Sequence, residues 1–311
     1  MTSLSVCIVN WNTKSDLQAC LQALQTHPYT HGMQEVIVVD NASGDGSAAM
    51  VRAEFPDVRL IANRENRNYA PGTNKALAAA TGDYLLLLNP DARVTPGALD
   101  TLVRFLESHG DVGAVAAKLV HDDGTVQRSV RGFPDPVSVL WDMLKLPRFF
   151  PVLGTYRQSK FDYEKPGPAP QPMTSCLLLT RRAYETVGPM DERFPLYFND
   201  VDWCLQAKKA NVGVWYTPDA VVIHGYGGTT KKVRKTAVWE SHRALLRLWG
   251  KHYRETTPRA LYVTMTALVT LGAWVRTGRW GESLGKDGGE TTPENLHREL
   301  ERAGGSAGLP S

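Results

Sequence analysis

Cysteine is scarce in this chain and shows neither a metal-binding nor a disulfide pattern. Four cysteines occur among 311 residues, and none of them forms a Cys-x-x-Cys pair or a zinc-like spacing. Cys7 lies within an apolar, strand-like run, where a cysteine behaves as a small core residue. A disulfide framework and a structural zinc site are therefore not expected, and a reducing, cytoplasmic compartment fits best.

The chain also lacks a strong excess of charge of either sign. Its formal net charge is +3, far below the basic excess of dedicated nucleic-acid-binding proteins. Hydrophobic residues make up 42% and charged residues 22%, the usual balance of a soluble globular protein. The start, MTSLSVCIVNWN, has no basic segment followed by a long apolar one, so no secretory signal is expected. Nucleic acid is not an expected partner.

No run of apolar residues reaches the roughly 20 that a membrane-spanning helix needs. The nearest candidate, ALYVTMTALVTLGAWV at residues 260–275, is uncharged and flanked by Arg259 and Arg276. Two interpretations are open. The segment is either a core helix or a helix that lies in a membrane interface, with Trp274 and Trp280 at the headgroups.

The first half of the chain alternates strand-like and helix-like patterns. Four apolar runs end in polar residues, namely SLSVCIVNWN, QEVIVVDNASGDGS, VRLIANREN and DYLLLLNPD. Between them lie KSDLQACLQALQTH, with Leu17, Leu21 and Leu24 at helical spacing, then AAMVRAEF and APGTNKALAAATG. Such alternation predicts an α/β fold with a mostly parallel sheet covered by helices.

Polar side chains gather where these four strands end. In parallel sheets, ligands bind outside the carboxyl ends of the strands. A single Asp or Asn there is often only a turn former, but four strands with the same feature favour a site. The residues are Asn10 and Asn12 after the first strand, Asp40 after the second, Asn63 and Asn66 after the third, and Asn89 and Asp91 after the fourth.

The second half of the chain is less regular. HDDGTVQRSVRGFPDP is typical of a hairpin or loop, and the proline-rich YEKPGPAPQPM at residues 163–173 cannot form a regular helix. A segment of this kind is either a surface loop or a mobile lid. Earlier in the chain, GDGS at residues 44–47 lacks the spacing of a nucleotide-binding loop and predicts a tight turn.

Two acids, Asp200 and Asp202, lie in the helical pattern YFNDVDWCLQAKKA. In one interpretation, Asn199 caps the helix and both acids favour its positive end. This explains Asp202, but it explains less well the bulky PLYF run directly before the helix. In the other interpretation, Asp200 carries chemistry.

His224 ends an apolar strand directly before a glycine-rich turn. A histidine in this position either ligates a metal or is structural. Together with Asp91 it would offer one oxygen and one nitrogen ligand, a set suited to Mn²⁺ or Mg²⁺ beside phosphate oxygens.

Taken in order, these segments resemble the family 2 glycosyltransferases, and in particular the rhamnosyltransferase-like branch that builds bacterial surface polysaccharides. The resemblance runs from about residue 4 to residue 253, through VCIVNWN, VIVVDNASGDGS, NRNYAPGTNKAL, YLLLLNPDA, the long PMTSCLLLT to HGYGG stretch and SHRALLRLWGKHY. It implies a GT-A fold over residues 1–253, with a Rossmann-like nucleotide-sugar-binding half (1–115) and an acceptor-binding half (116–253). A C-terminal helical segment (254–281) follows, and then a tail (282–311) whose Gly, Glu and Ser content predicts flexibility.

The resemblance also implies roles for individual residues. Asn89-Pro90-Asp91 stands where the family has its DxD motif, so Asp91 is the implied ligand of the divalent ion on the donor's diphosphate, and Asn89 replaces the first acid. Asp40 matches the aspartate that contacts the nucleotide base, and His224 matches a metal-linked histidine. The full set of nucleotide-sugar-binding residues implied is Asn10, Asn12, Asp40, Asn66, Asn74, Asn89 and Asp91.

Asp200 stands where the family's ED motif places the general base. Here Asn199 replaces the preceding acid. The loss of a neighbouring carboxylate would tend to lower the pKa of Asp200 relative to a pair of acids.

The implied activity is an inverting, metal-dependent sugar transfer from a nucleotide sugar to a glycan or lipid-linked glycan. The resemblance favours dTDP-rhamnose as donor and leaves UDP-sugars open. The expected place is the cytoplasm, with peripheral contact at the inner face of the cell membrane as an open interpretation. Two rivals remain: a non-catalytic nucleotide-sugar-binding protein, and a sugar nucleotidyltransferase, whose Gly-rich, basic loop after the first strand is missing from VNWNTKSDL.

Overall fold

The computed structural model describes residues 2–144, 156, 158, 160–225 and 234–277. The expected flexible tail (282–311), Trp280 and most of the glycine-rich turn after His224 lie outside the described residues. The chain forms two compact units. Unit 1 comprises residues 1–131 and 157–226, and unit 2 comprises residues 132–156 and 227–311. Residues 227–253 thus group with the C-terminal segment, whereas the resemblance places its boundary at residue 253.

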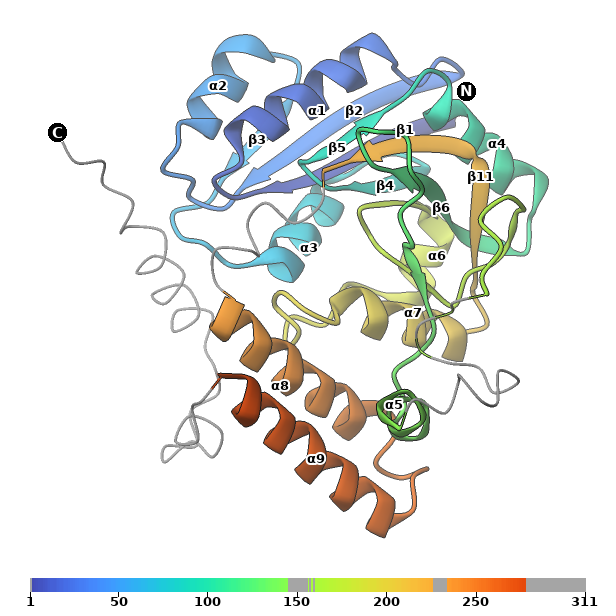
Figure 1. Ribbon diagram of the computed structural model, residues 1–311. Coiled ribbons are helices and arrows are strands. Elements are labelled where there is room, and N and C mark those ends of the chain that lie inside the picture. Colours follow the sequence, from blue (N-terminus) through green and yellow to red (C-terminus); the bar gives the residue numbers. More distant parts are fainter. Residues whose placement is uncertain (1, 145–155, 157, 159, 226–233, 278–311) are drawn as a thin grey trace, which may run out of the picture. The chain divides into compact units, whose positions relative to one another are not determined.

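Unit 1 is built on a mixed sheet whose strand order is β3-β2-β1-β4-β10-β6-β11-β5, with the short β8 beside β11 (Figure 1). Two further short strands, β7 and β9, pair with each other in a separate two-stranded sheet. The strands are β1 (Thr2–Asn10), β2 (Gly32–Asp40), β3 (Arg59–Ala62), β4 (Tyr84–Leu88), β5 (Ala92–Val94), β6 (Val112–Val120), β7 (Val130–Arg131), β8 (Gly167–Pro168), β9 (Gln171–Pro172), β10 (Cys176–Thr180) and β11 (Gly213–His224).

The pairing of the strands is mostly parallel, as the alternating pattern predicts. β1 pairs in parallel with both β2 and β4, and β2 pairs in parallel with β3. β10 runs antiparallel between β4 and β6, which therefore point the same way, and β11 is parallel to β6. The α/β class is confirmed, and the carboxyl ends of β1, β2, β3, β4, β6 and β11 share one edge of the sheet.

Helices cover both faces of the sheet. The helices of unit 1 are α1 (Lys14–Thr26), α2 (Ser47–Glu54), α3 (Tyr69–Ala79), α4 (Ala98–Ser108), α6 (Arg181–Val187) and α7 (Asn199–Lys209). The apolar stripe of α1 that the sequence predicts, including Leu17, Leu21 and Leu24, is buried in one core with α2, α4 and the sheet. α3, α6 and α7 lie across the opposite face (Figure 1).

The close approach of α3 to the sheet requires a glycine. A Cβ added at Gly72 would lie 2.8 Å from Cγ1 of Val9 in β1 and 3.3 Å from Nδ2 of Asn41. Because such contacts are too short for carbon atoms, only glycine lets this turn of α3 rest directly on β1.

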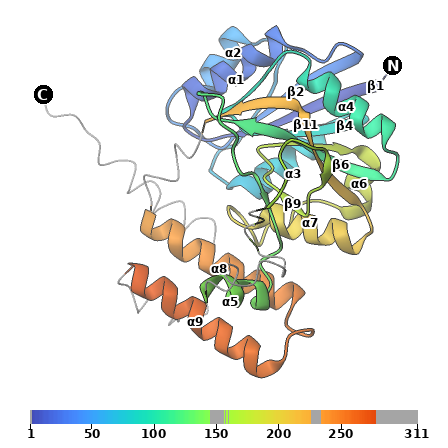
Figure 2. The same ribbon diagram turned by 45° about the vertical axis from the view of Figure 1, so that its right-hand side comes forward.

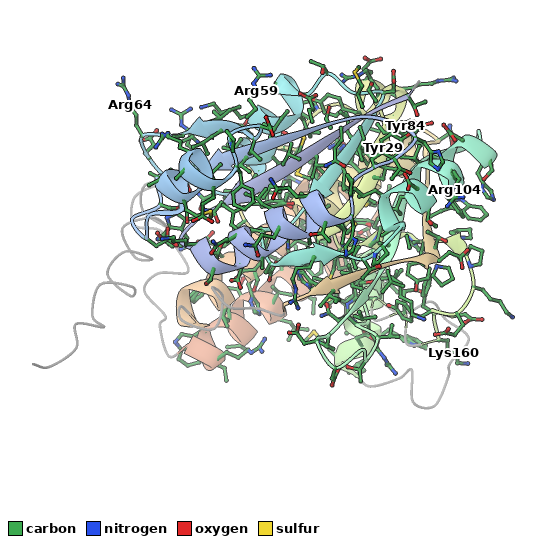
Figure 3. The ribbon with its side chains drawn as sticks, turned by 90° about the horizontal axis from the view of Figure 1, so that it is seen from above. Tyr29, Arg59, Arg64, Tyr84, Arg104 and Lys160 are labelled. Atoms are coloured by element: carbon green, nitrogen blue, oxygen red, sulfur yellow. The ribbon has the colours of Figure 1, made fainter. Side chains whose placement is uncertain are left out.

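The amino-terminal edge of the sheet is closed by polar contacts of its own. Tyr29, just before β2, bonds through its backbone N to Oε1 of Gln34 at 2.7 Å, and its hydroxyl lies 2.5 Å from Oγ1 of Thr2. Tyr84, the first residue of β4, is labelled near Tyr29 in Figure 3. These contacts tie the two strands together at this edge.

The proline-rich segment at residues 163–173 belongs to the sheet structure and is not the free loop or lid that its composition suggests. Its Gly167 and Pro168 form β8 opposite Tyr216 and Trp215 of β11. Its Gln171 and Pro172 form β9, which pairs with β7.

Unit 2 contains α5 (Pro136–Met143), α8 (Arg234–His252) and α9 (Arg259–Thr277). α8 and α9 lie side by side, as both ribbon views show (Figure 2). Their core includes Trp249, Met265 and Val269, and the indole Nε1 of Trp249 donates to O of Pro134 at 2.6 Å. Within the segments that the structure describes, no helix is long and apolar enough to span a membrane.

Candidate active site

The carboxyl edge of the sheet brings together most of the polar residues that the sequence singles out. The ends of β1 and β2 are in register, with Asn10 opposite Asp40. Asn89 follows β4, and His224 ends β11. Because the strands are parallel, side chains that are up to about two hundred residues apart in the chain meet at one edge.

Asn10 and Asp40 are the last residues of β1 and β2 at this edge. Both are buried, and Nδ2 of Asn10 donates to Oδ1 of Asp40 at 2.8 Å. The second oxygen of Asp40 accepts from the backbone N of Ser43 at 3.0 Å. Asn12 completes the loop, since its Oδ1 accepts from N of Gly44 at 2.8 Å. These bonds fix the loop after β2, and the contact of Asp40 with a nucleotide base stays a prediction.

A second asparagine cluster follows β3. Oδ1 of Asn66 accepts from N of Asn68 at 2.8 Å, and O of Asn68 accepts from Nδ2 of Asn41 at 2.9 Å. Asn68 has φ +67° and ψ −175°, a conformation that is nearly confined to glycine. Its buried Nδ2 has no hydrogen-bond partner among the described residues. Strain and an unsatisfied donor at one residue are typical of functional sites. Asn68 is not among the predicted site residues, because in the sequence it looks like an ordinary turn asparagine.

Asn74 has a different position from the strand-end residues. It lies on α3, where its Oδ1 accepts from N of Met190 and its Nδ2 donates to O of Met190, both at 2.9 Å. The first backbone amides of the same helix, those of Tyr69 and Ala70, donate to O of Pro195 at 2.9 and 3.1 Å. α3 thus anchors the segment that leads into α7. Direct contact of Asn74 with a nucleotide sugar stays a prediction.

The candidate metal site lies where β4 and β11 end. Nε2 of His224 is 3.3 Å from Oδ1 of Asp91, and Asp91 is 23% exposed, so its carboxylate is accessible. Nδ1 of His224 lies 2.9 Å from Oε1 of Gln127. Asn89 is held by Ser175, to which it donates from Nδ2 at 3.1 Å and from its backbone N at 3.0 Å.

These residues fit a divalent ion that takes part of its ligands from a substrate. The described residues contain no cluster of three or more His, Cys, Asp or Glu side chains that could hold a metal alone. A carboxylate and an imidazole nitrogen leave several positions for phosphate oxygens and water. The charge of Asp91 also reaches Asp16 in α1, whose pKa is raised by burial and secondly by Asp91. This local negative potential favours a cation.

The start of α7 differs from the capping interpretation of the sequence. The helix begins at Asn199, and the preceding Phe198, with φ +65°, takes the N-cap position. The side chain of Asn199 instead donates backward to O of Leu196 at 3.0 Å and to O of Phe194 at 3.3 Å. Asn199 is therefore not the cap. The aromatic residue in a left-handed conformation turns the chain sharply into the helix, directly before Asp200.

Asp200 is a partly exposed carboxylate with two hydrogen-bond donors. Oδ1 accepts from N of Val201 at 2.8 Å, and Oδ2 accepts from Nε2 of Gln171 at 3.0 Å. Burial raises its pKa from 3.8 to about 6, and the bond from Val201 opposes part of that rise. A carboxylate with such a pKa is ionised at neutral pH and is still basic enough to accept a proton. Asp202, in contrast, is fully buried and accepts from Nε2 of Gln206 at 2.8 Å.

A short stretch of chain links Asp200 to the strand-end cluster. Gln171 binds Asp200, and Ser175, four residues later, binds Asn89. Four residues of extended chain span at most about 14 Å. Asp200 and Asn89 thus bind side chains of the same short stretch of chain, and a single site that contains both stays a prediction.

Gln127 and Gln171 are site residues that sequence reasoning missed. Both are buried, and they contact His224 and Asp200 respectively. The sequence signal for Gln171 was its place between two prolines, as the one polar side chain of PGPAPQPM at residues 166–173.

A mixed α/β sheet with these polar side chains at its carboxyl edge defines the GT-A class of glycosyltransferases. The chain belongs to glycosyl transferase family 2, whose sequence profile matches residues 5–188, more than half of its length. It is a glycosyltransferase, and the resemblance to the rhamnosyltransferase-like branch is confirmed.

Three similar proteins illustrate this placement. The N-acetylglucosaminyl-diphospho-decaprenol L-rhamnosyltransferase of Mycobacterium tuberculosis is 29% identical over 206 residues, which cover 61% of this chain and 66% of the relative. The low-salt glycan biosynthesis hexosyltransferase Agl10 of Haloferax volcanii is 20% identical over 280 residues, which cover 87% of this chain and 83% of the relative.

Among solved structures, the fold is similar to mannosyltransferase PcManGT from Pyrobaculum calidifontis, in complex with GDP-Man and Mn²⁺. The TM-score is 0.55 at 19% identity, and the match covers 99% of this chain and 76% of that one. This likeness confirms the GT-A fold.

Proposed function

We propose that the chain is an inverting glycosyltransferase in cell-surface polysaccharide synthesis and that Asp200 is its general base. The observation that carries the proposal is Asp200 itself, a partly exposed carboxylate beside the strand-end site whose pKa burial raises to about 6. The resting charge and the basicity that a base needs at neutral pH are thus combined in one side chain.

In the proposed reaction, Asp200 accepts the proton of an acceptor hydroxyl while the hydroxyl oxygen attacks the anomeric carbon of the donor sugar. The bond from that carbon to the diphosphate breaks on the opposite face, and the configuration inverts. Asp91 and His224 would hold a divalent ion, Mn²⁺ or Mg²⁺, that neutralises charge on the departing diphosphate. The base would contribute about 10²–10⁴-fold to the rate.

The proposed donor is dTDP-rhamnose, and UDP-sugars are the second candidate. This choice rests on the name of the mycobacterial relative, an L-rhamnosyltransferase that acts on N-acetylglucosaminyl-diphospho-decaprenol. By the same comparison, the proposed acceptor is a glycan carried on a lipid diphosphate. The binding residues proposed for the donor are Asn10, Asn12, Asp40, Asn66, Asn74, Asn89 and Asp91.

A lipid-linked acceptor would explain why α9 exposes apolar side chains on its outer face. Val263, Leu271 and Val275 are 58, 43 and 66% exposed and lie on the same side of the helix. No charged residue occurs between Arg259 and Arg276, which stand at its two ends. An apolar stripe with terminal arginines suits the surface of a membrane with anionic lipids, and we propose peripheral contact there.

The test is a donor screen with purified protein, Mn²⁺ or Mg²⁺ and a panel of nucleotide sugars, read by thermal shift and then by product formation. We expect metal-dependent stabilisation by dTDP-rhamnose or a UDP-sugar, and transfer that Asp200→Asn abolishes while donor binding remains. Full turnover of Asp200→Asn would exclude Asp200 as the base. Binding of a donor without transfer to any acceptor would instead support the non-catalytic alternative, which the missing acid at Asn199 keeps open.

A further inference from the structure

The proline-rich segment has a stiffness that a plain connection between strands does not need. Proline occupies every second position from Pro166 to Pro172. Each proline ring fixes its own φ, so the segment loses little conformational entropy on folding and stays extended. A rigid segment of this kind can hold a side chain in a fixed position.

Backbone hydrogen bonds fasten the segment on both sides. Ala169 donates from its N to O of Val214 in β11 at 2.9 Å, and Met173 donates to O of Ser129 at 2.9 Å. Ala169 is fully buried in a small cluster with Tyr216 and Val130. Gln171 lies between these two attachment points, so its backbone position is fixed.

The amide of Gln171 has one possible orientation. Its side chain is buried, and Nε2 lies 3.3 Å from O of Pro172 as well as 3.0 Å from Oδ2 of Asp200. A backbone carbonyl can only accept a hydrogen bond, so the nitrogen and not the oxygen of the amide must be on this side. Gln171 therefore donates to the carboxylate of Asp200.

We propose that Gln171 is the positioning residue for the general base: it holds Oδ2 of Asp200 by a neutral donor and favours the ionised carboxylate. This inference rests on the proposed role of Asp200. A cation in the same place would favour the charged form far more strongly and would remove the basicity that proton transfer needs. A neutral amide fixes the rotamer of the carboxylate with a smaller effect on its affinity for the proton.

The surroundings of Asp200 make this hydrogen bond measurable. Tyr69 of α3 and Cys204 of α7 are titratable groups on which the charge of Asp200 acts. Burial raises the pKa of both, so both stay neutral while Asp200 titrates. Arg131 of β7 stands opposite Gln171 in register, but it is present in every variant compared below, so its contribution cancels.

The test compares Gln171→Met and Gln171→Glu with a matched control, Gln206→Met. Gln206 makes the same kind of bond on the same helix, from Nε2 to Oδ2 of Asp202 at 2.8 Å, but not to the base. Two readouts are used: the acid limb of the pH profile of kcat/KM, and a ¹³C carboxyl NMR titration of Asp200 in the free protein, assigned with Asp200→Asn.

We expect the pKa of Asp200 to rise by about one unit in Gln171→Met, because a hydrogen bond to the charged form is lost. Gln171→Glu keeps the shape of the side chain and should raise the pKa at least as far, because it places a second acid beside the first. At pH 6.5 this shift alone should lower kcat/KM about threefold, because a smaller fraction of Asp200 is ionised, and this loss should return at higher pH. Gln206→Met should leave both readouts unchanged.

The outcomes separate the two proposals. If the Gln171 variants shift the titration no more than Gln206→Met does, the positioning role is wrong even when transfer by the wild type is confirmed. If the wild type transfers no sugar, or if Asp200→Asn is active, the proposed function is wrong, and the NMR titration still measures the bond between Gln171 and Asp200. A Gln171→Met protein that does not fold leaves Gln171→Glu as the deciding variant.

Discussion

Gln127 binds His224 at two points. Nε2 of Gln127 donates to the backbone O of His224 at 2.6 Å, and Oε1 lies 2.9 Å from Nδ1 of the imidazole. Because the carbonyl can only accept, the amide oxygen must face the ring, and Nδ1 therefore carries a hydrogen. In the neutral ring this leaves the lone pair on Nε2, the atom 3.3 Å from Oδ1 of Asp91. Glutamine thus selects the tautomer that a metal ligand requires.

The first prediction concerns this metal site. His224→Ala and Asp91→Asn should each abolish the stabilisation that Mn²⁺ confers in the presence of a nucleoside diphosphate, because each removes a ligand. Gln127→Leu should keep both ligands but weaken Mn²⁺ binding by about 10–100-fold, since the tautomer of His224 is no longer selected. Isothermal titration calorimetry measures the affinities. His31→Ala, at an exposed histidine, is the control, and undiminished Mn²⁺ binding by His224→Ala would rule this histidine out as a ligand.

The second prediction concerns stability and pH. Burial raises the pKa of Asp200 from its ordinary 3.8 to about 6, so the folded protein holds this proton more tightly than the unfolded chain does. This tighter proton binding contributes stability to the folded protein, which is fully present below pH 3.8 and is lost as the pH rises through about 6. Asp200→Asn cannot titrate. Its free energy of unfolding, relative to the wild type, should therefore increase by roughly 2 kcal/mol between about pH 4 and pH 7.

Urea denaturation at several pH values measures this difference. Asp57→Asn, at an exposed carboxyl, is measured alongside as the control for the loss of a carboxyl group. A flat difference for Asp200→Asn would mean that Asp200 ionises as easily in the fold as in the unfolded chain.

The third prediction concerns the strained asparagine before α3. Asn68 has φ +67° and ψ −175°, so Asn68→Gly should stabilise the protein by about 1 kcal/mol through release of strain. Asn68→Ala should not, because it keeps the Cβ. Asn211→Gly is the control, since Asn211 has φ +56° and lies in a region that asparagine tolerates well. The midpoint of urea denaturation is the measurement. Loss of stability in Asn68→Gly would show that the asparagine side chain itself holds the loop.

The fourth prediction concerns the outer face of α9. Val263→Glu combined with Leu271→Glu should reduce binding to vesicles that contain anionic lipid by tenfold or more, because two charges replace exposed apolar contacts on one face. Co-sedimentation measures bound protein. Met33→Glu, at an apolar residue that is 71% exposed at the start of β2, should bind as the wild type does. Equal binding of all three proteins, or no binding by the wild type, would contradict the membrane proposal.

Local patterns predicted the sheet and its polar edge well. Apolar strands that end in Asn10, Asp40, Asn89 and His224 do meet at one edge, because the direction of parallel strands follows from strand–helix alternation alone. Helical spacing in α1 and in α9 also led to helices at the expected places. In each case the signal lies within ten to twenty residues of chain.

Local sequence patterns could not predict contacts between segments that are distant in the chain. One of the two interpretations of the sequence places Asn199 at the cap of α7, because asparagine is a common N-cap residue, yet Phe198 takes that position and Asn199 donates backward to O of Leu196. The proline-rich segment was interpreted as a loop or a lid, because its partners in β7 and β11 are not visible locally.

The fold class, the family and the polar residue types at the strand ends can be predicted from the sequence, since periodicity and local turn chemistry are encoded residue by residue. Which of these side chains touch depends on the folding of the whole chain. Gln127 is 97 residues from His224 and Gln171 is 29 residues from Asp200, and pairs so far apart are joined by the sheet's register and not by any local preference. The orientation of the imidazole and the basicity of the partly buried Asp200 depend on those partners and on the exclusion of water, both of which arise only when the chain is folded.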